Sequence, residues 1–97
     1  MTPVYFSPEA EDDLKDIWGY LSQYGADIAD DFVARVAKIC DRLERFPRSG
    51  AAMPDIRPDL RCVPLDHYRF FYRIGEAGVE IARIIHAKRD SDAIFKS

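Results

Sequence analysis

The sequence has few of the residues that build metal sites or covalent cross-links. Its 97 residues include two cysteines and two histidines, and Cys40 and Cys62 have no CxxC spacing. We therefore predict no metal site and no cofactor. A disulfide between the two cysteines is compatible with the sequence, but an intracellular chain favours free thiols that serve as small apolar core residues.

Long apolar runs are also lacking. The longest are only a few residues, which is too short for a membrane span. The N-terminal stretch MTPVYFSPEAEDD has neither the basic start nor the apolar segment of a signal peptide. We expect a cytoplasmic protein with no membrane partner, built as a single domain over residues 1–97.

An excess of positive charge is lacking as well, since 14 lysines and arginines against 17 acids give a formal net charge of −3. Residues 1–46 carry ten acids and five bases, whereas residues 47–97 carry seven acids and nine bases. Proteins that bind nucleic acids are usually basic, because phosphate neutralisation drives their affinity. Direct nucleic-acid binding is therefore disfavoured, although a local basic patch in the second half would be compatible with it.

The first half of the sequence predicts a short strand and two amphipathic helices. Residues 3–6 form the strand, Ser7 caps the first helix, and Pro8 suits its first position. Apolar residues then repeat at helical spacing until Gly25 (Ala10, Leu14, Ile17 and Leu21). The second helix begins near Asp27, carries a similar stripe (Phe32, Val36, Ile39, Leu43 and Phe46) and ends at Pro47. Such a helical hairpin needs a second layer to cover its apolar stripe.

The second half predicts a loop over residues 47–59 and three strands. The first strand, residues 60–65, contains Pro64 and should lie at a sheet edge, because proline cannot donate to a strand ladder. The other two flank the turn 75–78 and form a hairpin, followed by a short turn or helix around residues 92–95. The predicted fold is α+β in the order β-α-α-β-β-β, with the helical hairpin packed on a small, mainly antiparallel sheet.

Strict alternation assigns the hairpin residues to two faces. In the first run Tyr68, Phe70, Tyr72 and Ile74 point one way, and Arg69, Phe71 and Arg73 point the other. In the second run Val79, Ile81, Arg83 and Ile85 share a side, opposite Glu80, Ala82, Ile84 and His86.

The order and spacing of several motifs resemble the ParE toxins, within the wider RelE/ParE group of bacterial toxin–antitoxin systems. The motifs extend over nearly the whole chain and read FSPEA (6–10), IWGYL (17–21), FPRSG (46–50), RPDLR (57–61), YRFFYRI (68–74), VEIARIIH (79–86) and AKRD (87–90). The resemblance implies a type II toxin neutralised by a ParD-like antitoxin encoded next to it. ParE-like toxins are associated with DNA gyrase, whereas the related RelE-like branch cuts messenger RNA on the ribosome.

A metal-independent ribonuclease would need a base, an acid and cations for the phosphate. The sequence offers His86, Arg61 and Arg83, with Tyr72 as a further candidate. For His86 we favour a structural role, in which the ring lies at the end of a strand and only hydrogen-bonds a carbonyl. With four lysines and a negative charge, the chain also lacks the lysine-rich surface of RelE-like enzymes. We therefore expect no catalytic residue, and keep the mRNA interferase as the alternative, together with a non-toxic module that still binds antitoxin.

The remaining charged and aromatic residues are candidates for binding an acidic protein segment. Arg61 and Arg83 are balanced between structural and binding roles, whereas Arg69 and Arg73 are expected to be solvated or paired with acids such as Glu80. Trp18, with Tyr20 and Tyr24, is assigned to the core or its margin, or else to a groove that receives an antitoxin helix. The acidic run in residues 9–16 is expected to be a solvated helix face. The candidates for antitoxin or target binding are Arg57, Arg61, Arg83, His86, Lys88, Arg89 and Trp18, and nucleic acid is expected only indirectly, through the toxin–antitoxin complex.

Overall fold

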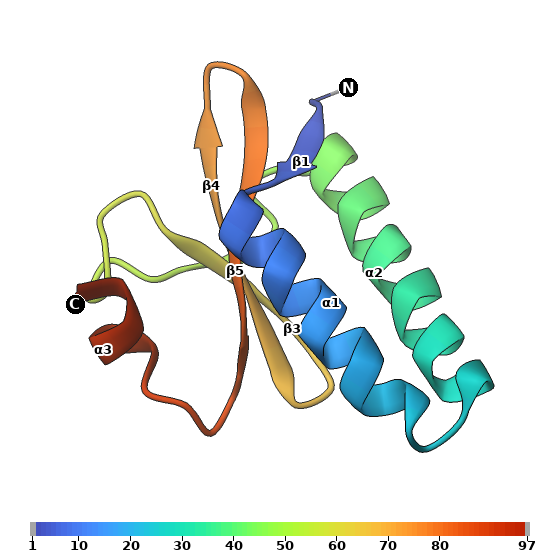
Figure 1. Ribbon diagram of the computed structural model, residues 1–97. Coiled ribbons are helices and arrows are strands. Elements are labelled where there is room, and N and C mark those ends of the chain that lie inside the picture. Colours follow the sequence, from blue (N-terminus) through green and yellow to red (C-terminus); the bar gives the residue numbers. More distant parts are fainter. Residues whose placement is uncertain (1, 97) are drawn as a thin grey trace.

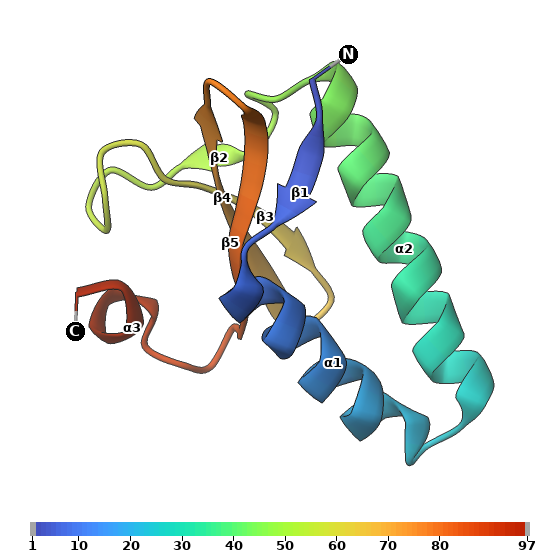
Figure 2. The ribbon, with the colours of Figure 1, turned by 45° about the horizontal axis from the view of Figure 1, so that its top comes forward.

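The computed structural model describes residues 2–96, and within them one sheet is covered by helices on both faces (Figures 1 and 2). In chain order the elements are β1 (Val4–Phe6), α1 (Pro8–Ser22), α2 (Ala26–Arg45), β2 (Ala51–Ala52), β3 (Arg61–Leu65), β4 (Tyr68–Gly75), β5 (Gly78–His86) and α3 (Ser91–Lys96). The strand order is β1-β5-β4-β3-β2. β1 runs parallel to β5 and every other pairing is antiparallel. The predicted α+β class and element order are confirmed, apart from the two-residue strand β2.

The start of α1 and the break between α1 and α2 form as the sequence predicts. The Ser7 hydroxyl accepts a hydrogen bond from the Ala10 amide at 3.0 Å, and Pro8 occupies the first turn of α1. α1 ends at Ser22, shortly before Gly25, whose φ of 147° places it in a backbone region that favours glycine. Gly25 is thereby the residue that redirects the chain into α2.

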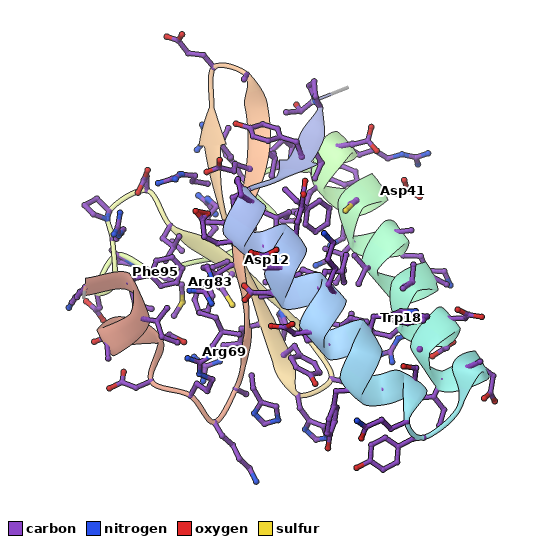
Figure 3. The ribbon with its side chains drawn as sticks, in the orientation of Figure 1. Asp12, Trp18, Asp41, Arg69, Arg83 and Phe95 are labelled. Carbon is purple, nitrogen blue, oxygen red and sulfur yellow. The ribbon has the colours of Figure 1, made fainter. Side chains whose placement is uncertain are left out.

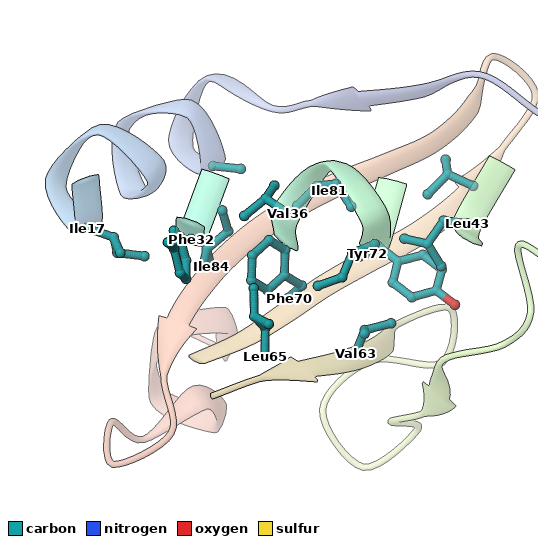
Figure 4. Close-up of a cluster of buried hydrophobic side chains, with 13 residues drawn as sticks. Ile17, Phe32, Val36, Leu43, Val63, Leu65, Phe70, Tyr72, Ile81 and Ile84 are labelled. Atoms are coloured by element: carbon teal, nitrogen blue, oxygen red, sulfur yellow. The ribbon is translucent and has the colours of Figure 1, made fainter. Parts of the chain in front are cut away.

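One face of the sheet carries the larger core, beneath α1 and α2 (Figure 4). Tyr72 and Phe70 are fully buried there, against Val36 and Leu43 of α2 and Ile17 of α1. The opposite face carries a smaller core in which Phe71 and Ile85 meet residues of the 53–60 loop and of α3. Cys62 is buried in this second core and Cys40 is half-buried beside the first, so the sheet separates the two free thiols.

A β-bulge in β5 overturns the strict alternation predicted for that strand. Phe71 faces Arg83 and Tyr72 faces Ile81, which leaves Ala82 without a partner. The extra residue shifts every later side chain to the other face. Ile84 therefore joins Ile81 in the larger core, while Ile85 belongs to the smaller one. The predicted faces hold for β4 but are wrong for β5 from Arg83 onward.

Three other predictions need correction. Phe46 follows the last residue of α2 and is 64% exposed, so it does not continue the apolar stripe. Trp18 is 44% exposed on α1, and Tyr20 and Tyr24 are more exposed still, so none of the three is a core residue. The strand that contains Pro64 is expected at a sheet edge, but β2 pairs with Arg61 and Cys62, the first two residues of β3. β3 is therefore an edge strand only from Val63 onward, where Pro64 lies.

Candidate functional site

The ion pair between Asp13 and Arg83 joins α1 to the bulged strand. The Asp13 carboxylate accepts hydrogen bonds from Arg83 Nε at 2.8 Å, Arg83 Nη2 at 3.0 Å and the Ile84 amide at 2.9 Å. The hydrogen bond to Asp13 raises the pKa of the Arg83 guanidinium above its ordinary value. Asp13 is thus an exception to the expectation that the acidic run is solvated, because only 16% of its side chain is exposed.

Arg83 also lines a hollow of about 240 Å³ on the face of the sheet that carries α3. Figure 3 shows the labelled Arg83 side chain between α1 and α3. We call this site the arginine hollow, because three segments each contribute a guanidinium. Its lining residues are Ser7, Glu9, Arg57, Leu60, Arg73, Ala82, Arg83, Ile94 and Phe95.

Each arginine of the hollow has a different set of contacts. Arg73 pairs with Glu80 across the hairpin, with Nη2 at 2.8 Å and Nε at 2.9 Å from the same oxygen. This pairing is the structural role that the sequence favours for Arg73. Arg57 donates to the Phe95 carbonyl at 2.7 Å and lies 5.8 Å from the centre of its ring. Arg57 is exposed and makes no ion pair with an acid in residues 2–96, so its charge is available to a partner.

Arg61 supports the loop that follows α2. Its Nη1 donates to the carbonyls of Arg48 at 3.0 Å and Gly50 at 2.8 Å. The buried Tyr72 hydroxyl holds the same loop, since it donates to the Pro47 carbonyl at 2.6 Å and accepts from the Gly50 amide at 2.9 Å. Burial raises the pKa of Tyr72.

His86 borders a separate groove between the end of the helical hairpin and the β3–β4 turn. The groove has a volume of about 390 Å³ and is lined by Tyr20, Leu21, Phe32, Asp66, His67, Tyr68 and His86. The His86 ring stacks on His67 at 6.0 Å and meets Tyr68 edge-on at 5.4 Å. Its Nδ1 accepts a hydrogen bond from the Lys88 amide at 3.1 Å, instead of donating to a carbonyl as expected.

The three residues of the ribonuclease alternative do not meet. Arg83 lines the arginine hollow, Arg61 lines a different hollow beside Arg48, and His86 lines the groove near the β3–β4 turn. His86 pairs with Tyr68 at one end of β4, whereas Arg61 pairs with Tyr72 further along it. Arg61, Arg83 and His86 therefore do not form a common site in the folded chain.

The other binding candidates lie on open surface. Trp18 is on α1, and Lys88 and Arg89 are exposed in the turn between β5 and α3. Of the seven binding candidates, the structure gathers only Arg57 and Arg83 in the arginine hollow, as far as residues 2–96 are concerned. Sequence reasoning missed Asp13 as the partner of Arg83, because the two are 70 positions apart and no local pattern links them.

Within residues 2–96, no group of three or more histidine, cysteine, aspartate or glutamate side chains is arranged to hold a metal ion. The helices of this part also lack the combination of length and apolar character that crossing a membrane requires.

The chain is similar to known toxins over most of its length. Residues 4–91 match the family model described as the ParE toxin of the type II toxin–antitoxin system parDE. Toxin ParE1 of Mycobacterium tuberculosis is 32% identical over 88 residues, which cover 89% of this chain and 90% of that protein. Toxin ParE3 of Caulobacter vibrioides is 31% identical over 64 residues, covering 66% of this chain and 64% of that one. Among solved structures, a chain of the chromosomal ParDE system from P. aeruginosa superposes with a TM-score of 0.76 at 21% identity, covering 91% of this chain and 98% of its own.

Proposed function

Because the chain belongs to the ParE toxin family of type II toxin–antitoxin systems, we propose that it inhibits DNA gyrase by protein–protein binding and is neutralised by a ParD-like antitoxin from the adjacent gene. In this proposal residues 1–97 act as a single toxin domain, although Met1 and Ser97 lie outside the described residues. The protein would work in the cytoplasm, where gyrase acts. It would reach nucleic acid only through its protein partners.

The observation that carries the proposal is the family match over residues 4–91. Two features of the site support binding rather than catalysis. The arginine hollow places Arg57, which has no acidic partner in residues 2–96, beside Arg83, and this surface suits contacts with carboxylates. Arg83 would contribute the part of its guanidinium that Asp13 does not bind through Nε and Nη2. The separation of His86 from Arg61 and Arg83 disfavours the mRNA interferase alternative.

We propose roles for the sequence-derived candidates on the same basis. Arg57 and Arg83 would contact acidic residues of the antitoxin, and Arg61 would act by holding the loop after α2. Trp18, Lys88, Arg89 and His86 stay candidates for contacts with the antitoxin or the target, since each is wholly or partly exposed.

A gyrase supercoiling assay with the purified chain tests the proposal. We expect excess toxin to block supercoiling of relaxed plasmid, and the co-purified product of the adjacent gene to restore it. Full supercoiling at excess toxin would contradict a gyrase target. In cells, induction of the chain alone should stop DNA synthesis before translation. Cleaved transcripts would instead indicate the interferase, and normal growth combined with a stable antitoxin complex would indicate the non-toxic module.

A further inference from the structure

The loop after α2 is fixed from several directions. The Phe46 amide donates to the Arg42 carbonyl at 2.7 Å, and the Ser49 amide donates to the Phe46 carbonyl at 3.0 Å. From the sheet, the Tyr72 hydroxyl bonds the Pro47 carbonyl and the Gly50 amide. Arg61 of β3 donates to the carbonyls of Arg48 and Gly50. A loop held by this number of hydrogen bonds loses little conformational entropy when it binds a partner.

This rigid loop exposes an apolar surface. The ring of Phe46 is 64% exposed, the largest exposed fraction among the large apolar side chains of residues 2–96. It borders a shallow hollow of about 630 Å³ lined by Arg45, Phe46, Pro47, Arg48, Ser49 and Ile74, which we call the Phe46 surface. An exposed aromatic side chain on a preorganised backbone is typical of the anchor points of protein interfaces.

The charge of the Phe46 surface is opposite to that of the chain. Arg45 and Arg48 line it, no acid does, and neither arginine forms an ion pair within residues 2–96. The C-terminal end of α2 gives Arg45 a favourable place next to the helix dipole. Arg48 lies beyond the helix, so the dipole does not account for it. A local cationic site on a chain of net charge −3 fits an acidic partner.

We propose that the Phe46 surface is a docking site for an acidic protein segment that inserts an apolar side chain beside Phe46 and places carboxylates on Arg45 and Arg48. An apolar side chain would cover Phe46, Pro47 and Ile74, and guanidinium groups bind carboxylates in a bidentate geometry. The net charge of −3 disfavours nucleic acid more strongly than a short acidic segment, because nucleic-acid binding depends on neutralising many phosphates. The site is separate from the arginine hollow, with which it shares no lining residue.

Peptide selection on the immobilised full chain tests the assignment. From a random 12-residue library, we expect enrichment of peptides that carry Leu, Ile, Met or Phe flanked by Asp or Glu. The leading peptide, labelled for fluorescence anisotropy, should bind Phe46→Ser and the Arg45→Glu/Arg48→Glu variant at least about tenfold more weakly, which corresponds to about 1.4 kcal/mol. Phe46→Leu should retain most of the affinity because it keeps an apolar contact.

Matched variants separate local from general effects. Val33→Ser removes an exposed apolar side chain on α2, away from the Phe46 surface, and Lys15→Glu/Lys38→Glu reverses two exposed charges elsewhere. Both controls should bind the peptide as the parent does. Circular dichroism at the assay temperature should show that every variant is folded, because the altered side chains are exposed. Only Arg45→Glu should lower the melting temperature slightly, since it places a negative charge at the C-terminal end of α2. Enrichment of basic peptides, or affinity that is insensitive to Phe46, would overturn the proposal. It would also be overturned if a 20-nucleotide single-stranded DNA bound more tightly than the peptide and lost affinity in the Arg45→Glu/Arg48→Glu variant.

Discussion

The Asp13 carboxylate and the Arg83 guanidinium, 70 positions apart in sequence, form an ion pair that attaches α1 to β5 directly beyond the bulge. The same carboxylate accepts the Ile84 amide, so one side chain fixes both the orientation of Arg83 and the strand after Ala82. This contact links the packing of the helical hairpin to the geometry of the arginine hollow on the other face of the sheet.

Replacing Asp13 should lower the stability of the fold. Asp13→Ala removes three hydrogen bonds, two of them from a charged donor, and leaves the Ile84 amide without its partner. We expect the free energy of unfolding to fall by about 1–3 kcal/mol, measured by urea denaturation. Asp12→Ala is the control, since the exposed Asp12 shares the helix but not the contact, and equal losses in the two variants would contradict this role.

Tyr72→Phe should destabilise the protein in a pH-dependent way. The variant loses the hydrogen bonds to Pro47 and Gly50, so we expect a loss of about 1–3 kcal/mol near neutral pH. Burial raises the pKa of Tyr72 in the folded protein above the ordinary value of 10.0. The protonated hydroxyl therefore stabilises the fold fully at pH values below the pKa of the unfolded chain, and this stabilisation is lost as pH rises through the pKa of the folded protein. The difference between parent and variant should therefore narrow above pH 10, and a constant difference across this range would contradict the assignment.

Two glycine-to-alanine substitutions should have opposite effects. A Cβ at Gly50 would lie 2.6 Å from the Tyr72 ring and 2.9 Å from the Cys62 carbonyl oxygen, so Gly50→Ala should cost about 1–3 kcal/mol. A Cβ at Gly19, inside α1, would meet no atom within 4 Å. Gly19→Ala should raise stability by about 0.5–1 kcal/mol, because alanine is the better helix former. Thermal unfolding of both variants measures the two effects, and a neutral Gly50→Ala would show that the loop can move away from Tyr72.

Reversing the charge of Arg57 should weaken antitoxin binding more than it weakens the fold. Arg57 is exposed on the rim of the arginine hollow and has no acidic partner in residues 2–96. For Arg57→Glu we expect at least about a tenfold loss of affinity for the product of the adjacent gene, measured by calorimetry. Lys15→Glu, an exposed reversal on α1, should leave this affinity unchanged, and equal losses would point to a general charge effect.

The sequence predicts the elements well because their signals are local. The cap at Ser7, the helical stripes that include Ile17 and Val36, and the alternation of β4 each depend on residues a few positions apart. β2 was missed because two alanines in a loop carry no such signal, and their pairing depends on Arg61 and Cys62 of a later strand.

The candidate site was less predictable. Arg57 and Arg83 were identified by residue type, but their common hollow depends on how α3 and the 53–60 loop pack on the sheet. Phe46 continues the helical spacing in sequence, yet α2 ends one residue before it and its ring is exposed.

The sequence by itself therefore determined the family, the order of the elements and the residues available for binding, because motif spacing and periodicity are properties of the linear chain. Only the tertiary structure decided which of those residues meet. The unpaired Ala82 reverses the faces of β5, and the pairing of Asp13 with Arg83 follows from the placement of α1 against that strand. Such contacts join residues distant in sequence, and their existence depends on strand register and packing.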